Sequence, residues 1–408
     1  MTTINTDFTL QNGVTIKNRL VKGAMSEQLG TKEHNPVPGL ANLYRRWAEG
    51  GTGLCITGNV MVDRNALGEP GNVVLDEQSD LDTFKEWARA GKSENMMIWP
   101  QINHPGKQSP DFLSPEPVAP SAIPLDIKDS MAAKFKRPRE LTESDIRGII
   151  HKFATTARLC KEIGFDGVQI HAAHGYLVSQ FLSPRHNQRK DQWGGSLENR
   201  TRFLIEIYRE IREAVGDGTD GFCIGVKLNS SDFMKGGFSE EDSMKVIKKL
   251  SDEGVDLIEI SGGGYEEVTF LNGIENPREA FFLNYAENVR KVSDAPLVVT
   301  GGFRSTAGMN DALKNDATDF IGISRPLSAD PDFSNKVLEG KHYRTDLKAR
   351  STGIKKLDRM TMIDFLWHQQ QIVRMSNAQE PDPNLSEWKA IWTNIKAMGR
   401  YSFRRMRA

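Results

Sequence analysis

The sequence is poor in cysteine and carries almost no net charge. Its three cysteines, Cys55, Cys160 and Cys223, are sparse and odd in number, which argues against a disulfide framework and fits a reducing compartment. None belongs to a Cys-x-x-Cys pattern, which speaks against an iron–sulfur site. Lys and Arg number 53 against 54 Asp and Glu. We therefore expect no basic surface for nucleic acid, and any phosphate-bearing ligand has to be held by local groups.

Long hydrophobic runs and a signal-like start are also missing. No window approaches the roughly 18 consecutive apolar residues of a membrane span. The first residues, Met1 to Asp7, hold no positive charge followed by an apolar stretch, so they do not resemble a secretory signal. We therefore expect a cytoplasmic protein with no membrane partner.

Short apolar stretches that alternate with helix-sized segments make up most of the chain. Such runs are typical of parallel strands covered by helices. An Asn-Gly pair within residues 8–16 predicts a β-hairpin that plugs the amino-terminal mouth of a barrel. The pattern indicates an α/β protein with a (β/α)8 TIM barrel, and a doubly wound open sheet is the alternative. The eight candidate strands are residues 19–25, 53–60, 96–104, 165–171, 222–229, 256–261, 295–301 and 318–323.

Helix signals separate several of these strands. Thr142 is the expected N-cap of a helix that runs to Ile163 and stops at Gly164. Residues 199–215 place apolar side chains at helical spacing. A further helix opens at Ser239, where three acidic residues form its first turn.

Two segments fall outside the repeating pattern. Residues 105–141 are Pro-rich and lack a steady period, and we expect this long loop after the third strand to cap the site, with a surface excursion as the alternative. Past the eighth strand, tryptophans among polar residues predict helices packed on the barrel or on a second subunit. We thus expect a barrel over residues 1–340 and a helical C-terminal extension over residues 341–408. The oligomeric state is left open, a homo-oligomer included.

The most informative stretch is residues 164–176, which ends one strand and delivers His171, His174 and Tyr176 within six positions. In a parallel barrel, the carboxyl ends of the strands carry the chemistry. Two imidazoles can hydrogen-bond one oxygen, and a phenol can supply a proton to a nearby atom. This suits a reaction that polarises a carbonyl while a carbon is protonated. The alternatives are histidines satisfied by core hydrogen bonds and a metal site, although two ligands fall short of a usual site and we expect no metal.

The run from Gly164 to Arg200, with its Trp-Gly-Gly-Ser at residues 193–196, closely resembles the old yellow enzyme family of FMN-dependent oxidoreductases. The resemblance extends from about Phe8 to about Phe333. It implies reduction of activated carbon–carbon double bonds with hydride taken from NADH or NADPH through bound FMN. It also implies that both histidines of this run, at 171 and 174, bind the substrate's electron-withdrawing oxygen, and that the tyrosine at 176 donates the proton.

Glycines at the end of the seventh strand and an arginine after the eighth suit a phosphate. In barrels, the loops after these two strands commonly bind phosphate near the start of a short helix. Gly301 and Gly302 let backbone N–H groups approach an anion, and Arg325 can clamp it with two hydrogen bonds. The family resemblance places the FMN phosphate on these three residues and on Ser324.

A cation near N1 and an amide at the pyrimidine edge are suited to bind the flavin ring. Lys227, near the end of an apolar strand, can stabilise the negative charge of a reduced flavin. A core lysine paired with a carboxylate is the alternative. Gln101 offers both a donor and an acceptor to the pyrimidine edge, with a structural amide as the alternative. The resemblance adds further contacts to the ring at Gly23, Ala24 and Ser26, with an ordinary capping or turn residue as the alternative for Ser26. Gly58 and Asn59, which end the second strand, are expected to contribute to the wall of the ring site.

No Gly-x-Gly-x-x-Gly fingerprint is visible between a strand and a helix. We therefore expect the nicotinamide coenzyme and the substrate to share one site in ping-pong turnover. The expected function is an FMN-dependent NAD(P)H oxidoreductase acting on α,β-unsaturated carbonyl compounds. The alternatives are a flavin-dependent amine or alcohol dehydrogenase, a non-catalytic flavin-binding protein, and an aldolase-like barrel with Lys227 as the Schiff base. The substrate, its stereochemistry and the choice between NADH and NADPH stay open.

Overall fold

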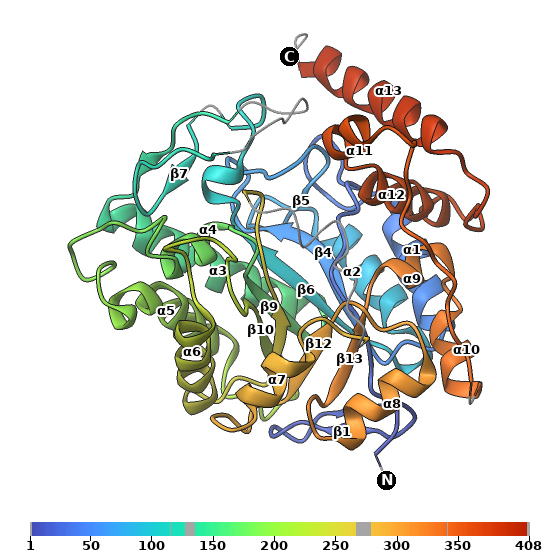
Figure 1. Cartoon of the computed structure of the whole chain (residues 1–408). Helices are drawn as coiled ribbons and strands as arrows, with labels where there is room; N and C mark the ends of the chain where they lie inside the picture. Colours follow the sequence, from blue (N-terminus) through green and yellow to red (C-terminus); the bar gives the residue numbers. More distant parts are fainter. Residues whose placement is uncertain (1, 115, 127–134, 267–278, 341, 406–408) are drawn as a thin grey trace.

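A closed parallel barrel forms the centre of the protein (Figure 1), as seen in a computed structural model that describes residues 2–114, 116–126, 135–266, 279–340 and 342–405. The main sheet has nine strands, of which β5 (Val73–Val74) pairs only with β4. The other eight close into a barrel because β3 pairs with both β13 and β4. The predicted (β/α)8 fold and its eight strands are therefore confirmed. These strands are β3 (Leu20–Lys22), β4 (Leu54–Met61), β6 (Met97–Asn103), β9 (Gly167–Ala172), β10 (Cys223–Asn229), β11 (Leu257–Ser261), β12 (Leu297–Thr300) and β13 (Phe320–Ile323).

Helices follow each barrel strand and surround the sheet (Figure 1). The start of α3 shows how the sequence sets these ends: the Thr142 hydroxyl accepts a hydrogen bond from the Asp145 N–H at 3.2 Å, and the Asp145 carboxylate accepts one from the Thr142 N–H at 2.8 Å. Gly164 ends the helix with a φ of 102°, which favours glycine. The helices are α1 (Pro38–Glu49), α2 (Leu81–Gly91), α3 (Glu143–Ile163), α4 (Leu177–Leu182), α5 (Leu197–Val215), α6 (Glu240–Asp252), α7 (Leu283–Val289), α8 (Thr306–Lys314), α9 (Arg325–Ala329) and α10 (Phe333–Glu339).

The amino-terminal half of the barrel interior is apolar. The predicted hairpin is present as β1 (Phe8–Thr9) paired antiparallel with β2 (Thr15–Ile16). Its side chains at 10 and 16 are buried against residues from seven barrel strands, so the hairpin closes this end of the barrel. We call this group the apolar layer; its members are Leu10, Ile16, Val21, Leu54, Ile56, Trp99, Cys223, Leu257, Val298 and Phe320.

The long loop after β6 lies at the carboxyl-terminal face of the barrel. It holds the short helix η2 (Gly106–Gln108) and the pair β7 (Val118–Ala119) and β8 (Arg139–Glu140). Its residues Lys107, Gln108 and Leu125 line a cavity together with the loops that follow β9 and β11. The loop therefore covers this face, as the sequence predicts, although residues 115 and 127–134 lie outside the described part.

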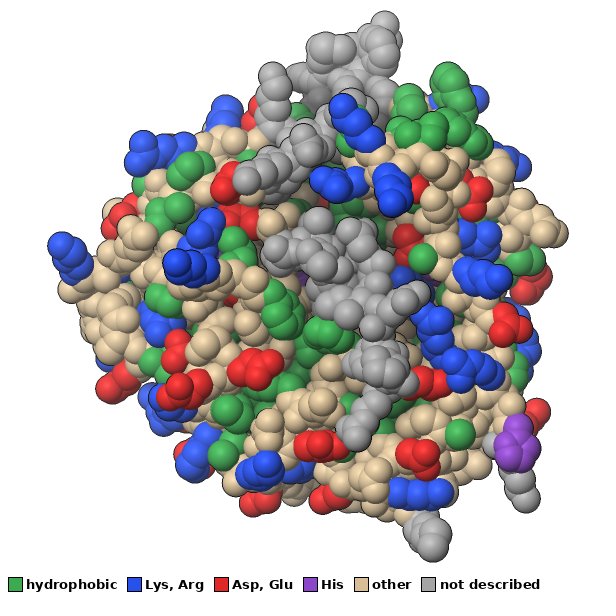
Figure 2. Space-filling view, in the orientation of Figure 1, with side chains coloured by type: hydrophobic (Ala, Val, Ile, Leu, Met, Phe, Trp, Pro, Cys, Tyr) green, Lys and Arg blue, Asp and Glu red, His purple; other side chains and the backbone are tan. Residues whose placement is uncertain are grey.

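The chain ends in three helices, α11 (Lys355–Thr361), α12 (Ile363–Ser376) and α13 (Glu387–Arg405). Of these, α12 packs on α1 and α9, while residues 341 and 406–408 lie outside the described part. The side chains of Trp388 and Trp392 on α13 are 49% and 63% exposed. Hydrophobic side chains indeed gather in Figure 2 at the end of the molecule where Figure 1 draws α13. Among the described helices, none combines the length and the apolar character that crossing a membrane requires.

Candidate active site

His171, His174 and Tyr176 meet at the carboxyl end of β9. The His171 ring centroid lies 5.1 Å from that of His174 and 4.8 Å from that of Tyr176, both edge to face. His174 has a φ of 59°, which is uncommon for a residue with a side chain. Tertiary contacts hold it there: its N–H donates to Asn229 Oδ1 at 3.1 Å and its carbonyl accepts from Gln108 Nε2 at 3.0 Å. The structure thus brings together the three residues that the sequence singles out.

Burial keeps both histidines neutral. It lowers the pKa of His171 well below its ordinary value and that of His174 to about 3, and the nearby Lys227 charge acts in the same direction. His171 Nδ1 accepts a hydrogen bond from the Ala173 N–H at 3.2 Å. The neutral ring therefore carries its proton on Nε2, where it can donate to a ligand oxygen. His174 Nε2 lies 2.7 Å from Ser261 Oγ.

Tyr176 is a protonated phenol. Its side chain is buried, at 8% exposure, and burial raises its pKa well above 10, as do the neighbouring Tyr265 and Glu69. Its hydroxyl lies 3.1 Å from the hydroxyl of Tyr265, on the loop after β11. Both phenols therefore carry their protons at neutral pH.

Above the apolar layer, the barrel interior becomes polar. Glu259 is the centre of a buried network: it accepts hydrogen bonds from Lys227 Nζ at 2.9 Å, Gln169 Nε2 at 2.8 Å and Thr300 Oγ1 at 2.8 Å. Gln101 Nε2 donates in turn to Gln169 Oε1 at 2.7 Å. Burial opposes the charge on Glu259, but Lys227 and the other donors outweigh it and lower the Glu259 pKa. We call Gln101, Gln169, Lys227, Glu259 and Thr300 the polar layer.

Two expected flavin ligands therefore have protein partners here. Lys227 is paired with a carboxylate, the arrangement that the sequence left open as an alternative, and Gln101 donates to another amide. Both side chains still lie in the barrel interior at the level of the active site, since Lys227 pairs in register with His171. Their contact with a flavin stays a prediction.

The loop after β3 lies against the ends of its neighbouring strands. A Cβ on Gly23 would come within 2.7 Å of Ser324 Oγ, so the absence of a side chain at Gly23 lets the two strand ends approach closely. The Gly58 N–H donates to Glu27 Oε1 at 3.2 Å, and the Ser26 hydroxyl donates to the partly buried Glu69 carboxylate. Ala24, which is partly exposed, packs against the apolar layer. The predicted flavin contacts of Gly23, Ala24, Ser26 and Gly58 stay predictions.

The predicted phosphate residues lie together at the ends of β12 and β13. Gly301 has a φ of 100°, and a Cβ there would meet no atom within 4 Å, so its backbone faces open space. Gly302 has a φ of 93° and approaches the backbone of Ala280. Arg325 begins α9 next to Ser324, but its Nη1 donates to Asp364 Oδ2 of α12 at 2.8 Å. In this structure, the guanidinium is bound by the C-terminal extension.

Buried amides show where a ligand fits. Asn59 Oδ1 and both amide atoms of Asn103 are buried and have no hydrogen-bond partner in the described part of the chain. Asn59 pairs in register with Gln101, and Asn103 follows two residues later on β6. Buried polar atoms without partners indicate a missing ligand or water. Together with the open backbone at Gly301 and the ammonium of Lys227, they fit a polar, anionic cofactor such as FMN.

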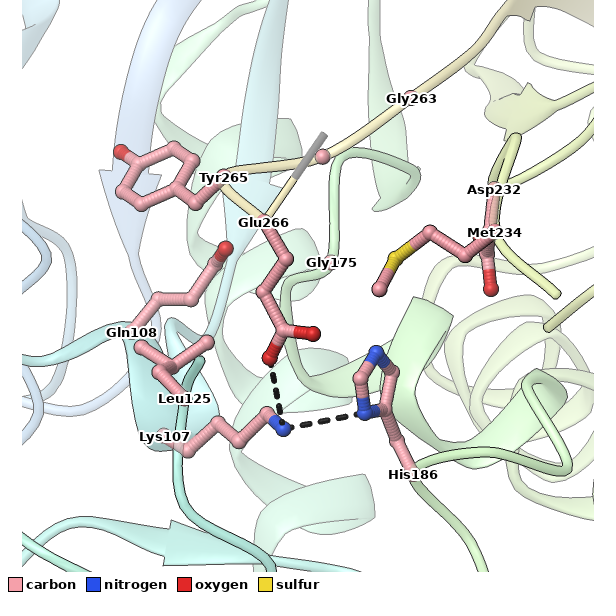
Figure 3. Close-up of a pocket in the computed structure, with 11 residues that line it drawn as sticks. Lys107, Gln108, Leu125, Gly175, His186, Asp232, Met234, Gly263, Tyr265 and Glu266 are labelled. Carbon is pink, nitrogen blue, oxygen red and sulfur yellow. Dashed lines mark hydrogen bonds and ion pairs between the residues drawn. The ribbon is translucent and has the colours of Figure 1, made fainter. Parts of the chain in front are cut away.

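A second buried cluster, shown in Figure 3, lies where the loops after β6, β9 and β11 meet. Lys107, which is 1% exposed, places Nζ 3.0 Å from His186 Nδ1 and 3.5 Å from Glu266 Oε1. Burial lowers the pKa of Lys107 and lowers that of His186 to about 3. No group of three or more His, Cys, Asp or Glu that could hold a metal ion occurs within the described ranges.

Sequence reasoning missed several residues of the site. Glu259 and Gln169 are polar residues inside apolar strands, the same signal that identified Lys227, and this signal could have found them. Glu69 and Tyr265 lie on loops with no local motif. Only the folded structure brings them beside Ser26 and Tyr176.

Comparison with known proteins shows the family of this chain. A model of the NADH:flavin oxidoreductase / NADH oxidase family matches residues 6–343. An NADH-dependent flavin oxidoreductase of Hypocrea jecorina is 39% identical over 351 residues, covering 79% of this chain and 86% of that protein. A cinnamate reductase of Clostridium sporogenes is 31% identical over 350 residues, covering 80% of this chain and 51% of that protein. This chain therefore spans about half the length of the cinnamate reductase.

Solved structures show the same fold. An old yellow enzyme homologue from Zymomonas mobilis superposes with a TM-score of 0.73 at 25% identity, covering 85% of this chain and 95% of that one. The family model covers most of the chain and the Hypocrea relative covers most of its own length. The chain therefore belongs to the NADH:flavin oxidoreductase / NADH oxidase family, the old yellow enzyme type of oxidoreductase that uses FMN and a nicotinamide coenzyme.

Proposed function

We propose that this oxidoreductase reduces the carbon–carbon double bond of α,β-unsaturated carbonyl compounds with electrons from NADH or NADPH. The observation that carries the proposal is the meeting of two neutral imidazoles and a protonated phenol at one strand end. A relative at 31% identity is named a cinnamate reductase, and cinnamate is itself a conjugated alkene. Bound FMN would supply the hydride.

In this proposal, the imidazoles hold the carbonyl oxygen of the substrate. His171 Nε2–H is a donor without charge, and His174, whose Nε2 lies 2.7 Å from Ser261 Oγ, would offer its Nδ1 as the second contact. As the double bond accepts hydride at its β-carbon, negative charge grows on the oxygen, so fixed donors there stabilise the transition state more than the ground state. Losing one such donor typically raises the barrier by about 2.7–4 kcal/mol.

Tyr176 donates the proton to the α-carbon. Its high pKa keeps the proton in place until the enolate forms. The nicotinamide coenzyme would use the same site in a separate half-reaction, giving ping-pong turnover.

We also propose which residues hold FMN. The ring would lie over the loop after β3 and the polar layer, using Gly23, Ala24, Ser26, Gly58, Gln101 and Lys227. The phosphate would lie at Gly301, Gly302, Ser324 and Arg325. Residues 1–340 would form this FMN-binding barrel and residues 341–408 an extension packed on it, an arrangement supported by the contact of α12 with α1 and α9.

The test is anaerobic reduction of the FMN-loaded protein by NADH and by NADPH, followed by reoxidation with 2-cyclohexenone and a panel of other enones. We expect a nicotinamide to bleach the flavin and an enone to restore its colour. Reduction by an amine or an alcohol, and not by a nicotinamide, would support the alternative dehydrogenase. Reduction that no enone reverses would falsify alkene reduction and leave FMN binding intact.

A further inference from the structure

We propose that Tyr265 relays a proton from solvent to Tyr176 during substrate reduction; the inference rests on the proposed role of Tyr176 as proton donor. The two hydroxyls lie 3.1 Å apart, and the ring centroids lie 5.9 Å apart in an edge-to-face arrangement. This is hydrogen-bond distance, so one phenol can pass a proton to the other without moving.

Tyr265 connects the buried donor with the outside. Tyr176 is buried at 8% exposure, whereas Tyr265 is partly exposed. Tyr265 also lines the cavity beside the catalytic residues, together with Gln108, Glu266 and other polar groups. In Figure 3, the Tyr265 ring and the Glu266 carboxylate leave the same loop in different directions, so Tyr265 stands apart from the ion pair with Lys107.

The fold fixes this pair. Gly264 forms a parallel bridge with His174, which attaches the loop after β11 to the strand end that carries the catalytic residues. Because Tyr265 and Tyr176 follow the bridged residues by one and two positions, the bridge sets the distance between their side chains. The loop therefore presents its phenol to Tyr176 in a defined place.

Neighbouring groups favour a relay through Tyr265. Asn59 also lies beside Tyr176, but an amide is no acid at neutral pH. The Glu69 carboxylate accepts hydrogen bonds from Ser26 and from Gln28 at 2.9 Å, and its charge raises the pKa of both phenols, that of Tyr265 to about 12 with burial as the larger cause. Both phenols therefore stay protonated until the enolate takes up a proton.

The proton balance closes with water alone. The O–H bond of Tyr176 breaks as a C–H bond forms at the α-carbon of the enolate. The O–H bond of Tyr265 breaks as its proton moves to the Tyr176 oxygen, so that no phenolate is left inside the site. Tyr265 then takes a proton from water at its exposed side and releases hydroxide, which solvent neutralises.

The test compares the two half-reactions of the FMN-loaded protein by stopped flow. In Tyr265→Phe, we expect reduction by NADH to stay within twofold, since it transfers hydride and no phenol proton. We expect reoxidation by 2-cyclohexenone to slow by roughly tenfold, a part of the 10²–10⁴ that general acid catalysis typically supplies. The matched control is Tyr208→Phe on α5, which removes a hydroxyl that donates to the Glu253 carbonyl at 3.1 Å where α6 ends, and it should change neither rate.

A proton inventory distinguishes a relay from a merely structural role. In mixtures of H2O and D2O, the wild-type reoxidation rate should fall along a curve, because two protons move, and that of Tyr265→Phe along a straight line. A straight line for the wild type overturns the relay without any variant. Equal slowing of both half-reactions in Tyr265→Phe overturns it as well.

Two further measurements separate this inference from the proposed function. If Tyr176→Phe reoxidises at the wild-type rate, the proposed proton donor is wrong and the relay fails with it. If Tyr176→Phe is slow and Tyr265→Phe is not, only the relay fails. In flavin-free protein labelled at tyrosine Cζ, Tyr265→Phe should shift the Tyr176 resonance and Tyr208→Phe should not, and an unmoved resonance contradicts the hydroxyl contact.

Discussion

On β6, β11 and β12, the apolar and polar layers lie two residues apart. Strand β6 gives Trp99 to the apolar layer and Gln101 to the polar layer, and β11 gives Leu257 and then Glu259. Side chains on one face of a strand recur every second residue, which is about 6.6 Å along the strand. Two residues along a strand therefore separate the hydrophobic core of the barrel from its polar site.

The two layers are stabilised in different ways. Apolar side chains gain free energy on burial with any neighbour that excludes water. A buried charge or amide gains little unless its partner has the right place, and it destabilises the fold strongly if that partner is lost. The apolar layer should therefore respond to changes in volume, and the polar layer to changes in charge.

The largest effect should come from the apolar layer. Trp99→Ala removes a side chain that is 0% exposed, and we expect it to lower the free energy of unfolding by about 3–5 kcal/mol because it leaves a cavity. Denaturant unfolding measures the change. Trp388→Ala, at a position that is 49% exposed, is the matched control and should have little effect. Similar losses in both variants would contradict a special role for the apolar layer.

In the polar layer, removing one charge should matter more than removing both. Glu259→Gln leaves Lys227 buried without a carboxylate, and we expect a loss of about 3 kcal/mol. Adding Lys227→Met should restore part of the loss, since no unpaired charge is then left.

Denaturant unfolding of the two variants and the wild type forms the measurement. Asp252→Asn, which breaks the ion pair of Lys248 and Asp252 with 58% and 56% exposed side chains, is the surface control. A double variant that is less stable than Glu259→Gln would show that the pair is not what stabilises this layer.

The sequence predicts most of the fold and the centre of the site. Apolar runs and their spacing determine the eight strands, and the strand end at residues 164–176 predicts the meeting of His171, His174 and Tyr176. These features are local, because the residues involved are close in the sequence and lie on one strand and the loop that follows it. The charge of Lys227 inside an apolar strand is likewise visible in the sequence.

Partners far apart in the sequence could not be predicted. Lys227 and Glu259 lie 32 residues apart, Tyr176 and Tyr265 lie 89 apart, and Arg325 and Asp364 lie 39 apart. Strand register and the paths of the loops bring such pairs together, and neither can be recognised from a local pattern in the sequence. The sequence therefore predicts candidate ligands of the cofactor, whereas the hydrogen bonds that already engage these side chains are visible only in the folded structure.

Lowering the pH should destabilise the fold through His174 at the active-site end of the barrel, whereas the apolar layer holds no group that takes up a proton in this range. The pKa of His174 is about 3 in the folded state because of burial, and about 6.5 in an unfolded chain. The folded state thus binds fewer protons between these values, and stability falls as the pH falls from 6.5 toward 3, by up to about 1.4 kcal/mol per pH unit for this group. In His174→Asn, this part of the pH dependence should disappear.

Unfolding measured at pH 7, 6 and 5 tests this. Trp99→Ala should lower the free energy of unfolding by the same amount at each pH, so that its slope against pH is unchanged. His151→Asn, at a side chain of α3 that is 75% exposed, is the histidine control and should follow the wild type. An unchanged slope in His174→Asn would mean that this histidine is not held neutral in the fold.

The smallest effect on stability should come from the partly exposed ion pair of Arg325 and Asp364, in contrast to the buried pair of Lys227 and Glu259. The side chains of Arg325 and Asp364 are 46% and 22% exposed, and exposed pairs contribute about 0–1 kcal/mol. Asp364→Asn should therefore leave stability almost unchanged. It also releases the guanidinium, so FMN should bind more tightly, by roughly fivefold or less on that energy scale. Riboflavin, which has the ring without the phosphate, is the control ligand, and its affinity should not change. Equal shifts for both ligands would mean that Arg325 acts on the ring or on the fold, and that the phosphate depends on the backbone at Gly301 and Gly302 instead.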